Sequence, residues 1–234
     1  MLSAPRRFYK SVTVEQGDGG WHVLLDDKVL RSPAKLGFAL PRGLAEAIAA
    51  EWDAQGDKIN PHSMPMMQLA ATAIDRIAAD RDRVIAETAG YGGSDLVCYR
   101  ADAPTELARR QEEVWQPLVV WVAERYDVAL VVTTGIVAVP QPAHALASFR
   151  RALEGADLYA LTAMAAMTAA AGSLVIALAL AEGRLTGEQA AEAALLDELF
   201  QAEKWGSDPE AETRRGRVRR DLADGLAFLH LSRP

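Results

Sequence analysis

The chain has 234 residues, half of them hydrophobic, and a formal net charge of −7 at pH 7. This composition excludes a disordered chain and allows a sizeable core, while the acidic balance argues against a nucleic-acid-binding protein. The lone cysteine excludes an internal disulfide, which indicates a reducing compartment, and the first residues hold no apolar stretch of the kind that a signal peptide needs.

The first forty residues predict a meander of short antiparallel strands. Hydrophobic and polar residues alternate, as expected for strands with one buried face, over residues 8–16, 21–25, 29–33 and 36–40. The sequences GDGG at 17–20 and DDK at 26–28 predict tight turns, since glycine tolerates a positive φ at little cost.

Helices dominate from Pro41 on. A proline costs nothing in the first helical turn, and the residues after it place Leu44, Ile48 and Trp52 on one face. We therefore expect a helix here that Gly56 ends. Further helices are expected over residues 65–79, 80–90, 105–126, 142–154, 156–182, 186–204 and 209–230.

These elements predict an α+β fold, mainly α, with a domain boundary near residue 60. Residues 1–60 are expected to form a small β-rich N-terminal domain with one helix. Residues 61–234 are expected to form a helical domain. Within it, the β-branched residues 128–139 fit either a strand or an irregular link.

Two of the expected helices carry further signals. In the helix over 105–126, Pro117 predicts a kink. Thr186 and Gln189 have the spacing of a capping box at the start of the helix over 186–204. In the helix over 105–126, the side that is expected to be buried holds Leu107, Val114, Leu118, Trp121 and Val122.

Residues 158–181 carry no charge and are long enough to be considered as a membrane span. They are rich in Ala, Thr, Ser and Gly, however, and acidic residues flank them, Asp157 before and Glu182 after. A span is expected to have basic flanks, whereas a helix that is apolar on all sides can also be the buried centre of a helical domain. The composition favours the buried helix, without insertion into a membrane.

The usual motifs of metal, phosphate and nucleophile sites do not occur. None of the four histidines has a second ligand at a familiar metal-binding spacing, and the GDGG segment lies in a hairpin rather than between a strand and a helix. We therefore expect neither a metal nor a cofactor. The basic run at 214–220 has the spacing of a solvated helix face.

The sequence YGGSDLVCYR, residues 91–100, allows two interpretations. A small hydrolase could use Ser94 or Cys98 as its nucleophile and Asp95 as its partner, but it would need a distant histidine as base. In the structural interpretation, Gly92 and Gly93 end a helix, Ser94 or Asp95 caps the next turn, and Cys98 enters the core. Residue types alone favour the structural interpretation.

A second stretch of interest is LLDELFQAEKWGSDPE, residues 195–210. Glu203, Lys204 and Trp205 lie at the end of an expected helix, and Gly206 is well placed to end it. A tryptophan beside acidic residues can be a core anchor, or it can be the aromatic centre of a partner-binding surface.

Several stretches together resemble one family, the assembly chaperones of the F-type ATP synthase that handle the α subunit of its catalytic head. The resemblance covers nearly the whole chain, and its most specific parts are Glu51-Trp52-Asp53, the tryptophans around Pro117, and Lys204-Trp205-Gly206. The matching stretches are RFYKSVTV (7–14), LAEAIAAEWDAQ (44–55), MPMMQLAATAIDRI (64–77), SDLVCYRA (94–101), WQPLVVWVAERYDV (115–128), FQAEKWG (200–206) and DLADGLAFLHL (221–231).

The resemblance implies a chaperone without catalytic activity, which binds the free α subunit and prevents its aggregation until it pairs with the β subunit. We expect the chain to be monomeric. It also implies a cytoplasmic, bacterial counterpart of a mitochondrial family. The candidate contact residues form two sets. The first is Glu203, Lys204, Trp205 and Asp208, and the second is Glu51, Trp52 and Asp53.

Overall fold

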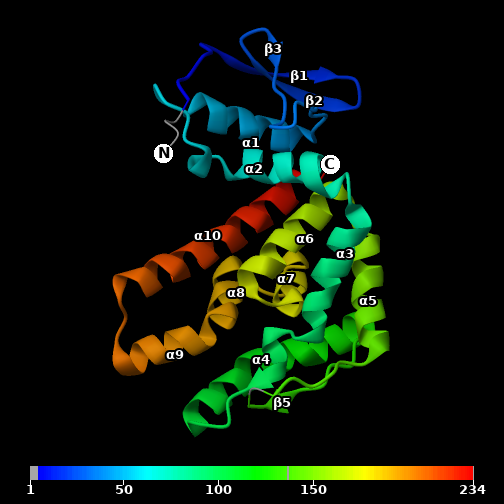
Figure 1. Ribbon diagram of the computed structural model, residues 1–234, viewed down its shortest axis with the longest axis vertical. Helices are drawn as coiled ribbons and strands as arrows, with labels where there is room; N and C mark the ends of the chain where they lie inside the picture. Colours follow the sequence, from blue (N-terminus) through cyan, green and yellow to red (C-terminus); the bar gives the residue numbers. More distant parts are fainter. Residues whose placement is uncertain (1–4, 136, 234) are drawn as a thin grey trace. The chain divides into compact units, whose positions relative to one another are not determined.

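The computed structural model describes residues 5–135 and 137–233, which form two compact units (Figure 1). The first unit takes in the described residues up to Arg81, residues 158–163 and the residues from Ala227 on, and the second takes in Asp82–Asp157 and Met164–Leu226. The α+β, mainly α, fold class is confirmed. The domain boundary near residue 60 stays a prediction, because these units are grouped by contacts and not by one cut in the sequence.

The first unit contains an antiparallel sheet whose strands follow the order β1 (Val12–Gly17), β2 (Gly20–Leu25) and β3 (Lys28–Val29). The alternation that predicted these strands turns Val23 and Leu25 inward, where both are buried. Helix α1 (Arg42–Asp53) packs on β1 and β2 and buries Leu44 and Ile48 completely. This sheet and its helix form the core of the first unit.

The expected strand over 36–40 is wrong. Within the described chain, these residues make only isolated bridges, Arg31 with Gly37 and Trp21 with Leu40. Leu40 and Trp21 exchange both backbone hydrogen bonds, but the carbonyl of Ala39 accepts from the hydroxyl of Tyr159 instead of from a strand. The backbone partners of this segment are thus divided among separate elements.

The helix expected over 65–79 is present but is not uniform. It consists of α2 (Pro65–Thr72), which continues into a π-helical segment, η2 (Ala73–Ile77). A short 3-10 turn, η1 (Pro61–Ser63), precedes it. Hydrophobic periodicity predicted the helix, but it carries no signal for the wider turn that follows.

The second unit is almost entirely helical. Its first half contains α3 (Arg81–Gly90), η3 (Tyr91–Gly93), η4 (Leu96–Cys98), β4 (Tyr99–Arg100), α4 (Thr105–Tyr126), β5 (Thr133–Thr134) and α5 (Ala143–Glu154). The remaining helices are α6 (Leu158–Ala171), α7 (Leu174–Ala181), α8 (Gly187–Ala194), α9 (Leu196–Trp205) and α10 (Pro209–Leu231). The start of α6 and the end of α10 belong to the first unit. Strands β4 and β5 pair in parallel, so the link over 128–139 holds one very short strand.

The single helix expected over 156–182 is wrong, because the chain forms α6 and α7 there. Gly172 has a φ of +65°, a left-handed conformation that glycine adopts readily, and it ends α6. Ser173 then caps α7 by accepting from the backbone N–H of Ile176. Residues 174–180 are all buried, as expected for a helix that is apolar on every side. Among the described residues, no helix is long and apolar enough to cross a membrane.

The helix expected over 186–204 is also divided. The capping box of Thr186 and Gln189 is confirmed at the start of α8, but Leu195 leaves the helical region with φ −104° and ψ 9°. The bend allows the consecutive side chains of Leu195 and Leu196 to be buried together. It also starts α9 in a new direction, and α9 carries the candidate surface.

Candidate partner-binding surface

The last residue of α9 is a tryptophan that faces solvent. Trp205 is 76% exposed, and Gly206, with a φ of +86°, ends the helix directly after it. The interpretation of Trp205 as a core anchor is therefore wrong. Tryptophan is enriched among the residues that dominate binding energy, so the exposed Trp205 is a candidate anchor for a partner.

Charged residues connect this end of α9 to α4. Both carboxylate oxygens of Glu203 accept from the guanidinium of Arg110, at 2.5 and 3.0 Å. Arg110 also donates to Glu106 at 2.8 Å, and the ammonium of Lys204 lies 2.7 Å from the other oxygen of Glu106. We call these four residues the α4–α9 charge cluster.

The two carboxyl groups of the charge cluster are held in their ionised form. Hydrogen bonds from Lys204 and Arg110 lower the pKa of Glu106, and those from Arg110 lower the pKa of Glu203. Beneath the cluster, the guanidinium of Arg110 and the ammonium of Lys204 lie 5.2 and 5.3 Å from the centre of the buried Phe200 ring. The cluster therefore fixes the orientation of α9 next to Trp205.

Asp208, the fourth residue of the first candidate set, starts the next helix. Its carboxylate accepts from the backbone N–H of Ala211 at 2.8 Å, in the first turn of α10. A polar hollow of about 320 Å³ lies beside Trp205, with Asp208 and Arg215 in its lining. All four residues of the first set thus lie in the second unit, around the turn from α9 to α10.

The second candidate set lies in the first unit, where two of its side chains are used by the fold. The carboxylate of Glu51 accepts from the backbone N–H groups of Met66 and Met67, at 2.7 and 2.8 Å, and so caps α2. Trp52 is half-buried and packs edge-on against Tyr9, with ring centres 5.5 Å apart.

Asp53 is the most exposed of this set, with 72% of its side chain accessible, and it forms an ion pair with Arg7. The role of Glu51, Trp52 and Asp53 in partner binding stays a prediction, and their contacts already explain Glu51 and Trp52 as structural residues.

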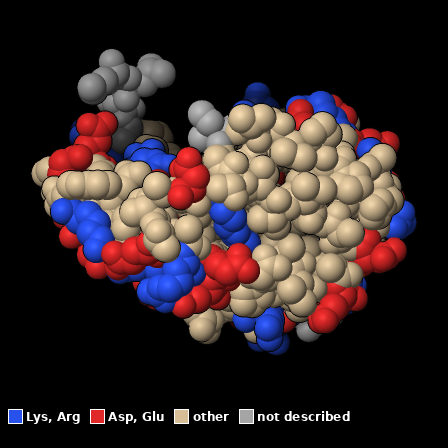
Figure 2. Space-filling view, turned by 90° about the horizontal axis from the view of Figure 1, so that it is seen from below, with Lys and Arg blue, Asp and Glu red and all other residues tan. Residues whose placement is uncertain are grey.

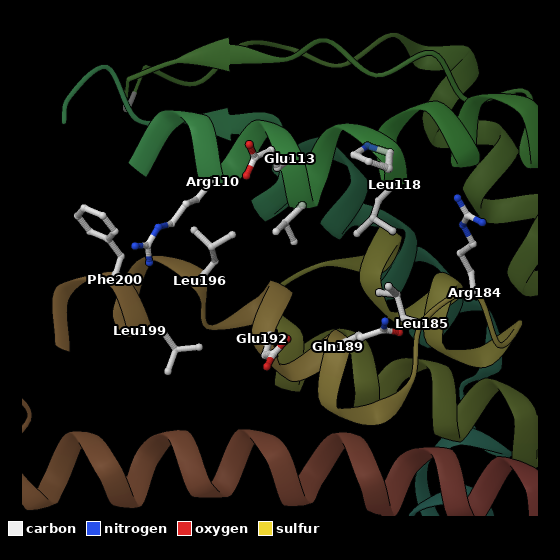
Figure 3. Close-up of a pocket in the computed structure, with 12 residues that line it drawn as sticks. Arg110, Glu113, Leu118, Arg184, Leu185, Gln189, Glu192, Leu196, Leu199 and Phe200 are labelled. Atoms are coloured by element: carbon white, nitrogen blue, oxygen red, sulfur yellow. The ribbon is translucent and has the colours of Figure 1, made fainter. Parts of the chain in front are cut away.

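A pocket of about 500 Å³ opens between α4, α8 and α9 (Figure 3). Leu118 from α4 and Leu196 and Leu199 from α9 lie around it, and Arg110 extends from α4 toward Phe200. Its apolar lining consists of Val114, Pro117, Leu118, Leu185, Leu196, Leu199 and Phe200. Because Arg110 and Phe200 belong both to this pocket and to the surroundings of the charge cluster, the pocket adjoins the Trp205 end of α9.

The sequence did not predict this pocket, because the hydrophobic pattern of α4 placed Val114 on the buried side of the helix. Val114 was expected in the core, but it is 39% exposed and lines the pocket. The buried side of α4 holds Leu107, Leu118 and Val122 as expected, and it also holds Trp115, which is completely buried and donates to the carbonyl of Ala193.

The contacts of residues 91–100 agree with the structural interpretation of YGGSDLVCYR. Asp95 is completely buried and accepts from the hydroxyl of Ser173 at 2.5 Å and from the backbone N–H groups of Val97 and Val175. It thereby caps both η4 and the start of α7. Cys98 is also completely buried, and burial raises the pKa of its thiol to about 12.

A hydrolase site at this segment is not supported. A thiol with so high a pKa stays protonated and is a poor nucleophile at neutral pH. Within the described chain, the hydrogen bonds recorded for Ser94, Asp95 and Cys98 involve no histidine.

Figure 2 shows acidic and basic side chains interleaved over one part of the face seen from below, next to a broad area without charges. Several of the charges on α4 are paired one turn apart, as in Arg109 with Glu113 and Arg110 with Glu106. Such pairs of opposite charge on α4 neutralise each other locally.

The candidate site is thus an exposed surface around Trp205, bordered by the charge cluster and the pocket of α4, α8 and α9. Comparison with known proteins then identifies the family. The sequence profile of the family described as ATP12 chaperone protein matches residues 6–123, and the chain belongs to this family of ATP synthase assembly chaperones.

Solved structures and a curated relative agree with this assignment. The crystal structure of Atp12 from Paracoccus denitrificans is 41% identical, with a TM-score of 0.93 over 97% of this chain and 98% of that one. A putative chaperone from Agrobacterium tumefaciens is 42% identical, with a TM-score of 0.91 over 97% of this chain and 85% of that one. The mitochondrial protein atp12 of Schizosaccharomyces pombe is 25% identical over 88% of this chain and 75% of its own length.

Proposed function

We propose that this chain binds the free α subunit of the ATP synthase catalytic head and shields it from aggregation until the β subunit replaces the chaperone. Membership of the ATP12 family supports a role in ATP synthase assembly. The choice of the α subunit as client rests on the resemblance of residues such as Lys204-Trp205-Gly206.

The observation that carries this proposal is the exposed Trp205 beside the ordered charge cluster. An unassembled subunit exposes apolar surface that would otherwise be buried in an interface, and such surface aggregates. A binding protein can cover that surface without consuming energy. It is then displaced by mass action when the tighter native partner arrives.

The experiment is co-purification of the isolated α subunit with the tagged chain, followed by measurement of Kd. We expect Trp205→Ala to weaken binding by about 2 kcal/mol, roughly 30-fold in Kd, because exposed tryptophans often dominate interface energy. Glu203→Lys should also weaken binding, since it places a third cation beside Arg110 and Lys204. Both variants should keep the helical circular-dichroism signal.

Phe8→Ala is the matched control, because Phe8 is an aromatic residue that is 70% exposed in the first unit. It should bind as the unchanged chain does. The proposal fails if the unchanged chain does not retain the α subunit, or if Trp205→Ala and Phe8→Ala have the same effect. If Glu203→Lys loses the helical signal, Glu203 is a structural residue instead.

A further inference from the structure

A second hollow extends the α4 pocket along the same helix. Its volume is about 520 Å³, and it shares Glu113, Pro117 and Arg184 with the first pocket. Val120, which is 46% exposed, and Trp121 add apolar surface to its lining. We call the two hollows together the α4 groove.

The border of the groove is acidic. Its carboxylates are Glu112, Glu113, Glu124 and Glu192, and its cations are Arg110 and Arg184. Arg110 is already engaged with Glu106 and Glu203. Glu113 is paired with Arg109, and Glu112 lies 3.8 Å from Arg100. The remaining lining charges are Glu124, Glu192 and Arg184, so the border keeps a small acidic excess that favours a positively charged partner.

We propose that the α4 groove receives an amphipathic segment of the client, apolar on the face that enters the groove and carrying Lys or Arg beside that face. Amphipathic helices commonly dock in grooves between helices in this way. The inference rests on the proposed function, since the client is the α subunit. It adds to that function a second contact, which adjoins Trp205, and it states the chemistry of the client segment.

A second copy of this chain fits the groove less well. The chain carries a net charge of −7, and the border of the groove is itself acidic. A symmetric pair of copies meeting at this groove would place carboxylates opposite carboxylates. A basic segment of another protein meets no such repulsion.

The apolar part of the inference is tested with Val114→Lys, measured as Kd for the isolated α subunit. We expect binding at least about tenfold weaker, because a charged side chain would stand where apolar surface is covered. Val131→Lys is the matched control, since Val131 is also 39% exposed but lies outside the groove. It should change Kd by less than about twofold.

Val120→Lys is the second variant, used if Val114→Lys lowers the thermal midpoint. The inference is overturned if the folded groove variants bind the α subunit as tightly as Val131→Lys does. It is also overturned if light scattering shows that the unchanged chain is a dimer that Val114→Lys dissociates. That result would assign the groove to a second copy.

The electrostatic part is tested with Glu192→Lys. At low salt we expect this variant to bind the α subunit about threefold more weakly than the unchanged chain, because one favourable charge contact has been reversed. Added salt should then weaken the binding of the variant less than it weakens that of the unchanged chain. Glu15→Lys makes the same charge change on the exposed face of β1 and should leave both values unchanged. Equal effects of the two substitutions would overturn the basic character assigned to the segment.

The two proposals fail in different ways. If the unchanged chain does not bind the α subunit, the proposed function fails. If the unchanged chain binds, and Trp205→Ala weakens binding while Val114→Lys and Val120→Lys do not, the proposed function stands and the groove inference alone is overturned.

Discussion

Gly92 is buried against the ring of Phe149. A Cβ atom at Gly92 would lie 2.6 Å from Cε2 of Phe149, closer than real Cβ contacts, and Phe149 is itself completely buried. The ring therefore has little room to move away. The first glycine of YGGSDLVCYR is explained by the space that a neighbouring helix occupies, not by chemistry.

We expect Gly92→Ala to lower the free energy of unfolding by about 1–3 kcal/mol, the usual cost of overpacking a core. Gly93→Ala is the matched control, because a Cβ at Gly93 meets nothing within 4 Å. Urea denaturation of both variants measures the difference. Equal stability of the two variants would contradict the packing shown here.

For single residues, the sequence predicted a capping or core role better than it predicted exposure to solvent. The capping role of Asp95 and the buried position of Cys98 follow from residue type and spacing, and both are confirmed. The exposure of Trp205 could not be predicted in this way. A tryptophan at a helix end is buried or exposed according to which element lies next to it, and that is decided by tertiary packing.

At the scale of elements, Asp95 joins η4 to α7. Burial raises its pKa to about 6 from an ordinary value of 3.8, although hydrogen bonds from Ser173, Val175 and Val97 act in the opposite direction. Between these two pH values the folded chain holds a proton that the unfolded chain has released. The contribution of protonated Asp95 to the free energy of unfolding is therefore complete below pH 3.8 and is lost as the pH rises through 6.

Asp95→Asn should remove this pH dependence, since an amide does not ionise; it keeps one of the two acceptor oxygens, so any loss of hydrogen bonding is the same at every pH. We expect the variant to gain stability relative to the unchanged chain between pH 4 and pH 7, by up to about 3 kcal/mol. Chemical denaturation across that range measures the gain. A difference that does not change with pH would contradict the raised pKa.

Asp26 provides a control, because its contribution to stability changes with pH in the opposite direction. Backbone hydrogen bonds from Lys10 and Ser11 lower its pKa, so its contribution to stability is lost as the pH falls. Relative to the unchanged chain, Asp26→Asn should therefore lose stability as the pH rises, whereas Asp95→Asn gains it.

The breaks between helices show where prediction from sequence stops at this scale. Hydrophobic periodicity placed α1, α4, α5 and α10 within about two residues of their bounds, because each has one buried face. Residues 158–181 have no periodicity, so only Gly172 marked the division between α6 and α7. The bend at Leu195 has no such marker and results from the burial of two successive leucines.

At the scale of the whole molecule, the first unit is assembled from three separate parts of the sequence. Phe228 and Leu229 are buried in it, and the ring of Phe228 lies 6.0 Å from that of Tyr159. The backbone of Leu231 also approaches Gly43 closely, within 2.8 Å of where a Cβ would stand. The sheet and α1 therefore depend on residues from the far end of the chain.

A chain that stops after Leu226 should lose the order of the first unit. We expect proteolysis to cut the β1–β3 region of this shortened chain at least about tenfold faster, because an unfolded segment is cleaved far more readily than a folded one. Mass spectrometry of the fragments locates the cuts. Unchanged protection of the strands would show that the sheet and α1 are stable by themselves.

The resemblance across nearly the whole chain identified the family, and the pattern of elements predicted the fold class; both are confirmed. The groove was beyond prediction from sequence, because it is formed by α4, α8 and α9 together and none of them signals it alone. The family profile itself ends at residue 123, before α8 and α9 begin.

The discontinuous first unit also ties the completion of its core to a late stage of synthesis. Its strands are made early and can pair with one another and with α1, but the residues from Ala227 on are made far later. Until then the core of this unit lacks Phe228 and Leu229. The first part of the chain to be translated therefore waits for a distant part before its apolar core is fully covered.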